Sequence, residues 1–410
     1  MKKILMVLNY FYPEYASTGQ LMTELCREIQ NEFHITVIAA MPSYTAEKQT
    51  EVYNKIQYDQ YENIRIIRVP VTKIDKTNKK SRLKYIFSYF INALKVILKE
   101  EKYDIIFTIS QPPILGGWLG TLGKLLKRNK LIYCIEDFNP EQIEAVGYSK
   151  KKWLTELARY LDNLTCKYAD QIIVVGRDMK STLLKRISAI NEEKISVINN
   201  WINEEEVYPL TKDHFKVQEF INRHNLSNKF IIMYSGNIGL YYDLENIIKV
   251  IEKFKTYQDM QFVFIGEGAK KQELIQYVET HRMENVLFLP YQPKEDIIYS
   301  LNAADLHLVT NQKGIKGVSV PSKIYGVMAV GKTILGILEK DSEAEILIRE
   351  SQCGIVVDPQ DYKSIEESIR NLYNHREQLE SIGVRGRKYL EEHLKMKDSI
   401  DMYRKLFHKI

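Results

Sequence analysis

Two turns in the second half of the chain combine glycine with the end of an apolar run. Gly236 and Gly239 come directly after FIIMYS. Gly266, Glu267 and Gly268 follow FVFI. Glycine lets the backbone approach a ligand closely, and free main-chain N–H groups at such a turn bind phosphate. Either turn alone is equally typical of an ordinary strand end, but two in succession predict a nucleotide site.

The segment GIKGVSVPSKIYGVMAVGKTIL places a cation beside a predicted helix start. Pro321 suits the first helical turn, and Ser322 and Lys323 lie at its positive end. We expect main-chain N–H groups near residues 320–323 and the Lys323 ammonium to bind a diphosphate. Gly314 and Gly317, which come before them, predict a flexible loop. The alternative is a helix that merely begins with proline.

The first half of the chain offers one glycine turn and one group of carboxylates after predicted strands. Gly19, in NYFYPEYASTGQL, can bring the backbone close to an anion. Glu136, Asp137 and Glu141 follow a later strand, in CIEDFNPEQIEAVG. Carboxylates at a strand end can bind the hydroxyl groups of an acceptor or accept a proton. Acidic surface loops also occur for solubility alone, so both interpretations stay open.

These turns can form one site only if the strands that precede them end at the same edge of a sheet. Short β-branched runs alternate with segments of helical period, which predicts parallel sheets covered on both faces. In the first half, strands are expected at residues 4–8, 35–39, 64–69, 105–109, 131–135, 171–175 and 195–198. In the second half, they are expected at residues 230–235, 262–265, 286–289, 306–309, 333–336 and 354–357.

A polar linker with Pro209, near residues 200–210, separates the two series of strands. We therefore expect an α/β fold of two doubly wound Rossmann-like domains, at residues 1–203 and 204–391, with a cleft between them. Apolar residues at helical spacing near the end predict that a helix at 392–410 crosses back onto the first domain. In this arrangement the first domain binds the acceptor and the second binds the nucleotide.

Length and composition support a globular protein of two domains. The chain has 410 residues, of which 45% are hydrophobic and 27% charged. No run approaches the roughly 20 apolar residues of a membrane-spanning helix. The start of the chain, Lys2-Lys3 before ILMVL, is not typical of a signal peptide. We therefore expect a cytoplasmic protein. The four cysteines form no CxxC pair, and we expect no metal. A net charge of +5 is mild for this length, and no nucleic-acid partner is expected.

A basic cluster precedes an apolar helical segment, YIFSYFINALKVIL. The cluster consists of Lys76, Lys79, Lys80, Arg82 and Lys84. Cations that lead into an apolar helix are typical of an interfacial anchor, and each gains roughly 1 kcal/mol near anionic lipid. We expect peripheral contact with the inner leaflet of an anionic membrane. The alternative is a solvated loop before a core helix.

Several of these segments together resemble glycosyltransferase family 4, a retaining family with the GT-B fold, and within it the bacterial branch that builds capsule and O-antigen sugars on polyprenyl carriers. The resemblance covers nearly the whole chain and is strongest in SQPPILGGWLGTL, EDFNPE, VINNWIN, YSGNIG, VFIGEGAKKQEL and VSVPSKIYGVMAVGKTIL.

The resemblance implies which residues hold the donor. The second domain would bind a nucleotide sugar, with its base near Glu267, Gly268 and Tyr291. The diphosphate would lie against the turn at 236–239 and the segment at 321–323, while Gly19 faces it from the first domain. The donor would be a UDP-linked sugar, often N-acetylated or deoxy, and the acceptor a polyprenyl-diphosphate-linked saccharide. No cofactor or metal ion is implied.

Two departures from the family pattern affect the donor site. Many relatives carry two glutamates eight positions apart, where this chain has Val318 and Gly326. Many also carry an arginine and a lysine in the first glycine turn, where Asn237 and Tyr242 stand. Asn237 therefore becomes a donor-binding candidate, and Lys323 is the best available cation.

The resemblance also implies a mechanism in which the leaving diphosphate assists the acceptor on the same face of the sugar. No protein nucleophile is then required. Lys323 and the main-chain N–H groups would stabilise the diphosphate, and Asp137 with Glu136, which stand where relatives have a histidine, would orient the acceptor hydroxyl. Two alternatives remain at this point: a UDP-N-acetylhexosamine 2-epimerase of similar architecture, and a non-catalytic scaffold for polysaccharide assembly.

Overall fold

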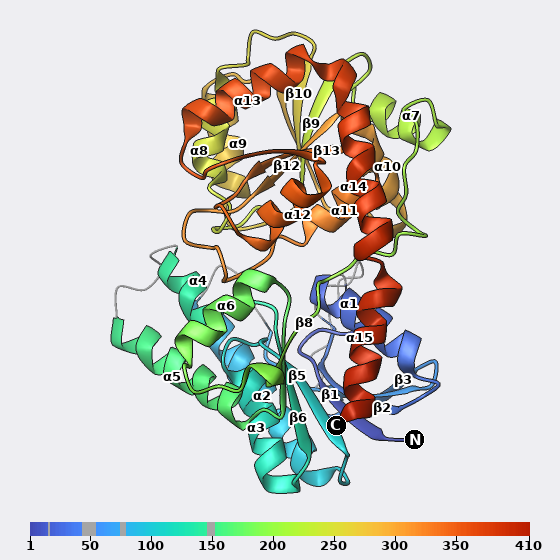
Figure 1. Cartoon of the computed structure of the whole chain (residues 1–410), viewed down its shortest axis with the longest axis vertical. Helices are drawn as coiled ribbons and strands as arrows, with labels where there is room; N and C mark the ends of the chain where they lie inside the picture. Colours follow the sequence, from blue (N-terminus) through green and yellow to red (C-terminus); the bar gives the residue numbers. More distant parts are fainter. Residues whose placement is uncertain (15–16, 43–54, 74–78, 146–151) are drawn as a thin grey trace.

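The computed structural model describes residues 1–14, 17–42, 55–73, 79–145 and 152–410. The chain forms two lobes that are stacked along the long axis (Figure 1). Each lobe contains one sheet, and the last helix runs from the second lobe onto the first (Figure 1).

The first sheet has eight strands in the order β3-β4-β2-β1-β5-β6-β7-β8. All neighbouring strands are parallel except β3 and β4. Its strands are β1 (Lys3–Val7), β2 (His34–Ala40), β3 (Gln57–Tyr61), β4 (Ile64–Val69), β5 (Ile105–Ile109), β6 (Lys130–Ile135), β7 (Gln171–Val174) and β8 (Ile195–Val197). Its helices are α1 (Ser17–Ile29), α2 (Lys79–Lys99), α3 (Leu115–Lys127), α4 (Asn139–Ala145), α5 (Lys152–Tyr168), α6 (Arg177–Arg186) and the 3-10 turn η1 (Glu192–Lys194).

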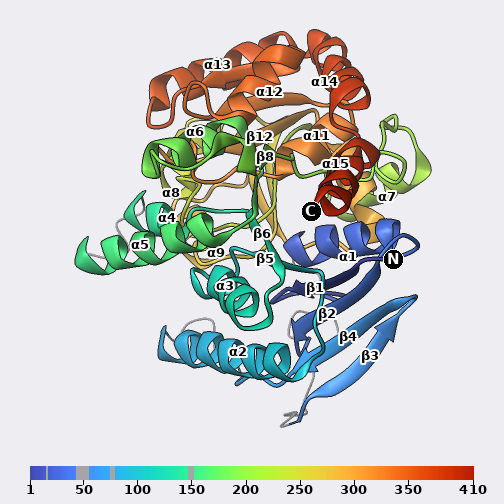
Figure 2. The same cartoon turned by 60° about the horizontal axis from the view of Figure 1, so that its bottom comes forward.

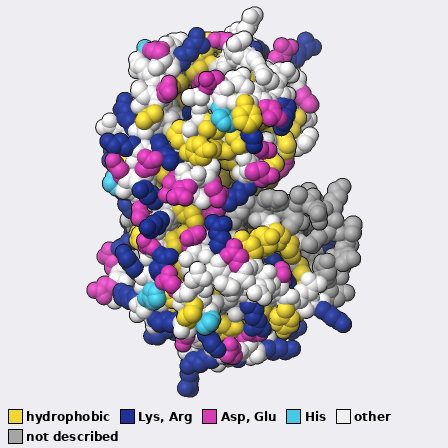
Figure 3. All heavy atoms as spheres, turned by 90° about the vertical axis from the view of Figure 1, so that its right-hand side faces the viewer, with side chains coloured by type: hydrophobic (Ala, Val, Ile, Leu, Met, Phe, Trp, Pro, Cys, Tyr) yellow, Lys and Arg dark blue, Asp and Glu magenta, His cyan; other side chains and the backbone are white. Residues whose placement is uncertain are grey.

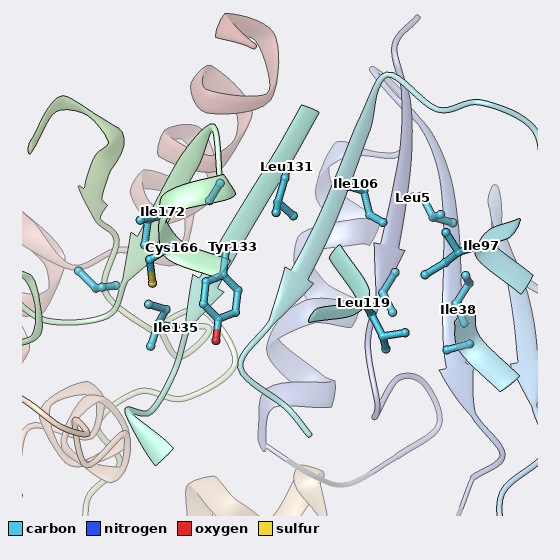
Figure 4. Packing of buried hydrophobic residues seen from close by; sticks show 14 of the residues in the cluster. Leu5, Ile38, Ile97, Ile106, Leu119, Leu131, Tyr133, Ile135, Cys166 and Ile172 are labelled. Atoms are coloured by element: carbon cyan, nitrogen blue, oxygen red, sulfur yellow. The ribbon is translucent and has the colours of Figure 1, made fainter. Parts of the chain in front are cut away.

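Helices cover both faces of this sheet, which is why its central strands are apolar along their whole length. Every residue of β5, IIFTI, is buried. On one face, side chains such as Leu5, Ile106 and Leu131 pack against Leu119 of α3 (Figure 4). The opposite face packs against α1 and α15. The continuous apolar runs therefore predict these strands well.

The edge strand β3 is absent from our expected strands. Its sequence, QYDQY, is exposed over its first four residues and pairs antiparallel with β4. Polar residues on an edge strand discourage pairing with other chains, so an edge strand of this kind lacks the apolar signal. Glu62, which has a positive φ of 51°, marks the hairpin turn between the two strands.

The second sheet has six parallel strands in the order β11-β10-β9-β12-β13-β14. Its strands are β9 (Phe230–Ser235), β10 (Met260–Ile265), β11 (Val286–Leu289), β12 (Leu306–Thr310), β13 (Thr333–Ile337) and β14 (Gly354–Val357). Its helices are α7 (Phe215–Arg223), α8 (Leu244–Glu252), α9 (Lys271–Thr280), α10 (Ile297–Ala303), α11 (Lys323–Ala329), α12 (Glu343–Ser351), α13 (Tyr362–Asn374) and α14 (Leu379–His393), with 3-10 turns η2 (Lys294–Asp296) and η3 (Arg376–Gln378).

The final helix, α15 (Met396–Lys409), lies on the first sheet (Figure 1). Ile400, Tyr403 and Phe407 are buried in the core between this helix and the sheet. Phe407 forms an edge contact with Phe33, at 5.8 Å between ring centroids. The Nζ of Lys2 donates to the carbonyls of Phe407 and His408, so the two ends of the chain are joined.

Among the helices that the structure describes, none has both the length and the apolar composition that a bilayer crossing requires.

We predict that Phe407→Ala destabilises the first domain by about 3–5 kcal/mol, because the substitution leaves a cavity in a closely packed core. The Phe407 side chain is fully buried, whereas Met402 on the same helix is 43% exposed. Urea unfolding followed by tryptophan fluorescence measures the effect, with Met402→Ala as the matched control. Equal stability of the two variants would contradict the packing of α15 on this sheet.

Candidate active site

The carboxyl ends of both sheets face each other across the space between the lobes, where the surface is hollowed (Figure 3). A cavity of about 670 Å³ lies there. Of the residues that the sequence proposes for the site, Ser322 lines this cavity, and Gly19 precedes Gln20, which also lines it. The remaining lining residues come from α1, the linker between the sheets, η2 and α10: Leu21, Glu24, Trp201, Ile202, Asn203, Glu206, Val207, Tyr208, Lys294, Glu295, Ile297, Ile298 and Tyr299.

The two glycine turns of the second domain pack directly on each other. Gly236 and Gly266 have positive φ values of 145° and 144°, a conformation that favours glycine. A side chain at Gly266 would overlap the carbonyl of Gly236, and one at Gly268 would overlap the carbonyl of Ile238. Close packing of the two turns therefore accounts, at least in part, for the glycines at these positions.

Some main-chain N–H groups in these turns donate hydrogen bonds to other described residues, and others do not. The N–H of Gly236 donates to Ile265, and that of Ile238 donates to Glu267 at 2.8 Å. Within the described part of the chain, the N–H groups of Asn237 and Gly239 have no hydrogen-bond partner. These two donors at the end of β9 are available for an anion.

Helix α11 begins later than expected and is short. Pro321 lies before the helix rather than in its first turn, because Ser322 is the N-cap and Lys323 the first helical residue. The exposed Ser322 lines the cavity. Among the described residues, the N–H groups of Ser322 and Lys323 have no partner, so the segment still presents donors to the cavity.

The side chain of Lys323 turns away from solvent. Its Nζ lies 3.6 Å from the ring centroid of Tyr234 and 4.2 Å from that of Tyr242. This Nζ is buried and has no hydrogen-bond partner among the described residues. Burial lowers the pKa of Lys323 well below its usual value. The Cε lies 3.3 Å from where a side chain at Gly236 would start, so the amine sits against the first glycine turn.

Glu136 and Asp137 are adjacent in sequence, but their side chains contact different parts of the protein. Glu136 is only 7% exposed, and its carboxylate accepts a hydrogen bond of 2.9 Å from Asn200 in the linker. Burial raises its pKa to about 7. The side chain therefore contacts the linker, and its expected contact with an acceptor stays a prediction.

Asp137 lies at the contact between the domains. It forms an isolated β-bridge with Ser319, and its carboxylate accepts hydrogen bonds from the side chains of Ser319 and Gln142. Burial raises the pKa of Asp137. The pKa of Tyr242 is raised by burial and then by the charge of Asp137. The structure thus brings Asp137 to the same region as Tyr242 and Lys323.

The loop that follows β12 is tied by hydrogen bonds to both domains, and its expected flexibility stays a prediction. The N–H groups of Gly314 and Lys316 both donate to the carboxylate of Glu339. The N–H of Gly317 donates to Asp178 of the first domain at 2.8 Å. Three hydrogen bonds to carboxylates therefore fix this segment at the domain contact.

Val318 occupies the first of the two positions where many relatives carry glutamate. It is 5% exposed and, together with Val320, packs into the apolar core of the first domain. The main-chain carbonyl of Val318 accepts from Phe138 at 2.9 Å. A carboxylate at this position would be buried among apolar groups, which explains the departure from the family pattern in this chain.

A second set of contacts between the domains was not predictable from the sequence. Arg177 donates through its backbone and its side chain to Glu343, which is 1% exposed. Asn199 in the linker donates to the same carboxylate at 3.0 Å. Arg177 and Glu343 belong to no motif that the sequence singles out, and Asn199, although it lies in VINNWIN, gives no sign of its partner.

A third network closes one wall of the cavity. Glu24 of α1 accepts from the indole of Trp201 at 2.9 Å and from Lys294 of the second domain at 2.9 Å. Lys294 also pairs with Glu206. The signal that pointed here was VINNWIN in the linker, but it did not reveal the partners of Trp201.

The remaining donor candidates lie at the end of the second sheet or on α1. Tyr291 is 53% exposed, and its hydroxyl lies 3.5 Å from the carbonyl of Glu267. Glu267 pairs with Lys271. Gly19 is buried in the first turn of α1, where a side chain would press on Tyr10.

The basic residues mostly belong to a helix rather than to a loop before it. Lys80, Arg82 and Lys84 lie in the first turns of α2 and are exposed. Lys79 is the first residue of that helix, although its side chain lies outside the described residues, and so does all of Lys76.

In the described ranges, no three side chains of His, Cys, Asp or Glu gather as a metal site would need.

Two family models match the chain in succession. Residues 18–206 match Glycosyltransferase Family 4, and residues 216–389 match Glycosyl transferases group 1.

Similar proteins align with this chain over most of its length. A probable glycosyltransferase of Pseudomonas aeruginosa, WbjE, is 27% identical over 91% of this chain and 90% of its own length. WcaI of Escherichia coli, a putative colanic acid biosynthesis glycosyl transferase, is 24% identical over 90% of this chain and 91% of its own length. The crystal structure of HepE from Anabaena, in complex with UDP and glucose, matches all of both chains with a TM-score of 0.74 and 14% identity. This match confirms the expected fold class.

We predict that Glu136 makes the stability of the protein depend on pH. Its pKa is about 7 in the folded chain and near the ordinary 4.5 when unfolded. The folded state therefore holds the proton more tightly, and this stabilisation is complete below about pH 4.5 and lost as pH rises through about 7. Relative to Glu136→Gln, wild-type stability should fall by on the order of 2–3 kcal/mol between about pH 5 and about pH 8.

Urea unfolding at several pH values checks this expectation, with the exposed Glu156→Gln as control. Parallel pH profiles for the wild type and Glu136→Gln would show that Glu136 keeps an ordinary pKa.

Proposed function

Because this chain belongs to the glycosyltransferases, with a family 4 domain followed by a group 1 domain, we propose that it moves a sugar from a nucleoside diphosphate to a lipid-linked saccharide. In this proposal the configuration at the anomeric carbon is retained. The observation that carries the proposed transfer is a set of N–H groups, at Asn237, Gly239, Ser322 and Lys323, that have no hydrogen-bond partner in the part of the chain that the structure describes. They lie at the carboxyl end of the second sheet, and Ser322 lines the cavity.

The second domain holds the donor in this proposal. The diphosphate accepts hydrogen bonds from the unpaired N–H groups, and Gly19 faces it at the start of α1. The base lies near Gly268 and against the half-exposed ring of Tyr291, which offers a flat apolar face. UDP is the nucleotide that the solved HepE structure contains, and we propose a UDP-linked sugar, N-acetylated or deoxy, for this chain.

The first domain holds the acceptor. Asp137 comes from the end of β6 and lies opposite the glycine turn, so its carboxylate can orient an acceptor hydroxyl. Glu136 positions the linker next to Asp137 by accepting a hydrogen bond from Asn200. The relative from Escherichia coli is described as acting in colanic acid synthesis, and we propose that this chain likewise builds a capsule, O-antigen or other surface polysaccharide on a polyprenyl diphosphate.

The proposed reaction breaks the bond between the anomeric carbon and the diphosphate oxygen. The acceptor oxygen forms the new bond on the same face of the sugar, and its proton passes to the departing diphosphate. Negative charge grows on the diphosphate, where the N–H groups and Lys323 stabilise it without a metal ion. The protein therefore contributes position and charge rather than a nucleophile.

Membrane contact is the last part of the proposal. Exposed cations at the start of α2 stand beside exposed apolar side chains on the same helix, a combination that binds anionic lipid surfaces. Helix α3 packs against both α2 and α5 (Figure 2), and α5 also exposes apolar side chains. The exposed apolar residues are Leu83, Phe87 and Ile91 on α2 and Trp153, Leu157 and Tyr160 on α5. We propose peripheral association with the cytoplasmic face of the membrane.

The central experiment combines purified protein, a panel of UDP-sugars and polyprenyl-diphosphate saccharides. Transfer with retention should appear for one donor, detected by mass spectrometry of the lipid product and by NMR of the new linkage. An epimer formed from UDP-N-acetylhexosamine without acceptor would instead indicate an epimerase. No turnover with any pair, in protein that binds its neighbours in an assembly complex, would favour a scaffold.

We predict that Lys323→Ala lowers kcat/KM for the transfer by about 100-fold or more, since it removes the cation nearest the proposed diphosphate. Initial rates with saturating acceptor measure the effect. Lys363→Ala is the matched control, because that lysine is 86% exposed on α13 and pairs only with the neighbouring Glu367 among the described residues. Normal turnover of Lys323→Ala would disprove this role.

We also predict that replacing Lys80, Arg82 and Lys84 by glutamine weakens binding to anionic vesicles by about 100-fold, at roughly 1 kcal/mol for each lost cation. Cosedimentation with vesicles that contain phosphatidylglycerol measures the binding, and added salt should reduce it in the wild type. Replacing the exposed Lys363, Arg385 and Lys388 of the second domain is the control of equal charge. Equal loss in both variants would show that no specific face contacts the membrane.

A further inference from the structure

The amine of Lys323 is enclosed at the end of β9 by parts of the second domain. Its Nζ lies 3.6 Å from the ring centroid of Tyr234 and 4.2 Å from that of Tyr242, and the two rings meet edge to face at 6.1 Å. Both rings belong to fixed structure. The Tyr234 hydroxyl donates to the carbonyl of Asn237, and the carbonyl of Tyr242 accepts from Thr310. The amine therefore lies in a preformed enclosure.

No carboxylate neutralises Lys323 within the described residues. The groups that face the enclosure are tyrosines: Tyr234 on β9, Tyr242 before α8 and, next to these two, Tyr291 after β11. Burial and then the charge of Asp137, in the first domain, raise the pKa of Tyr242, whereas burial lowers the pKa of Lys323. Ring faces attract an ammonium ion, but this attraction is weaker than the hydration that the ion loses when it is buried. The enclosure therefore favours the neutral amine.

The same amine lies against the turn that the proposed donor would occupy. Its Cε is next to Gly236, which has no side chain to separate the two, and Ser322, its neighbour in sequence, lines the cavity. A lysine side chain has four rotatable bonds and can carry its nitrogen from the rings to an anion at the turn. A diphosphate would supply the negative charge that the empty enclosure lacks.

We propose that Lys323 takes up one proton from solvent when the diphosphate of the donor binds, so that donor binding and protonation of this amine are coupled. The inference rests on the proposed function, because it needs a nucleoside diphosphate at the glycine turn. In the protein without donor, the neutral amine packs against the two tyrosine rings. When the donor is bound, the ammonium pairs with its diphosphate. No covalent bond changes, and the proton comes from water or buffer.

Calorimetry with UDP measures the coupling directly. Titrations at about pH 8, in buffers of different ionisation enthalpy, should give an uptake of about one proton for each UDP bound. At this pH the nucleotide and Glu136 are already ionised, so neither contributes. Between about pH 8 and about pH 9, the affinity should also fall by about tenfold for each unit of pH.

Variants assign the proton to one residue. Lys323→Met keeps the length and the apolar character of the buried chain, and it should bind UDP more weakly with no proton uptake. Lys363→Met, at an exposed lysine of α13 that pairs with Glu367, should behave as the wild type. Replacing Tyr242 by leucine opens the enclosure, so the uptake should fall below one.

The outcomes separate the two proposals. Binding of UDP by the wild type with no proton uptake and no dependence on pH would overturn the coupling and leave the proposed function intact. Failure to bind UDP or any nucleotide sugar would overturn both. Because the wild-type measurement stands by itself, a variant that fails to fold does not remove the test.

Discussion

The hydrogen bond from the N–H of Gly317 to the carboxylate of Asp178 joins the two domains at the point where both sheets end. Around it, Val318 and Val320 of the second domain pack into the core of the first. The loop after β12 is thereby part of both domains. Because Lys323 follows this loop within a few residues, the position of the proposed donor site is set by a contact with the first domain. The donor residues and the acceptor side are therefore not independent units.

This constraint also explains why the chain departs from its relatives. An acid at the position of Val318 would have to be buried among apolar side chains, and the amine of Lys323 lies beside the glycine turn. Asn237 and Gly239 then contribute backbone donors rather than charge. The donor site in this proposal relies on N–H groups and one lysine, where many relatives add side-chain carboxylates and further cations.

The fold was largely predictable from the sequence, whereas the site was predictable only in its outline. Buried parallel strands such as β5 consist of apolar residues throughout, so their signal survives without any alignment. β3 was missed because an exposed edge strand has no such run. For the site, the glycine turns could be located, but the direction of a side chain could not. Glu136 and Asp137 are neighbours in sequence, and only the structure shows that the first contacts Asn200 and the second contacts Ser319.

The return of α15 to the first sheet means that the backbone passes between the lobes twice, once at the linker near Asn200 and once between α14 and α15. The two connections lie side by side, because the N–H of Met396 donates to the carboxylate of Glu204 and the hydroxyl of Ser399 donates to the carbonyl of Asn199. Any bending of one lobe on the other must therefore deform both connections at the same place, since hydrogen bonds tie one to the other.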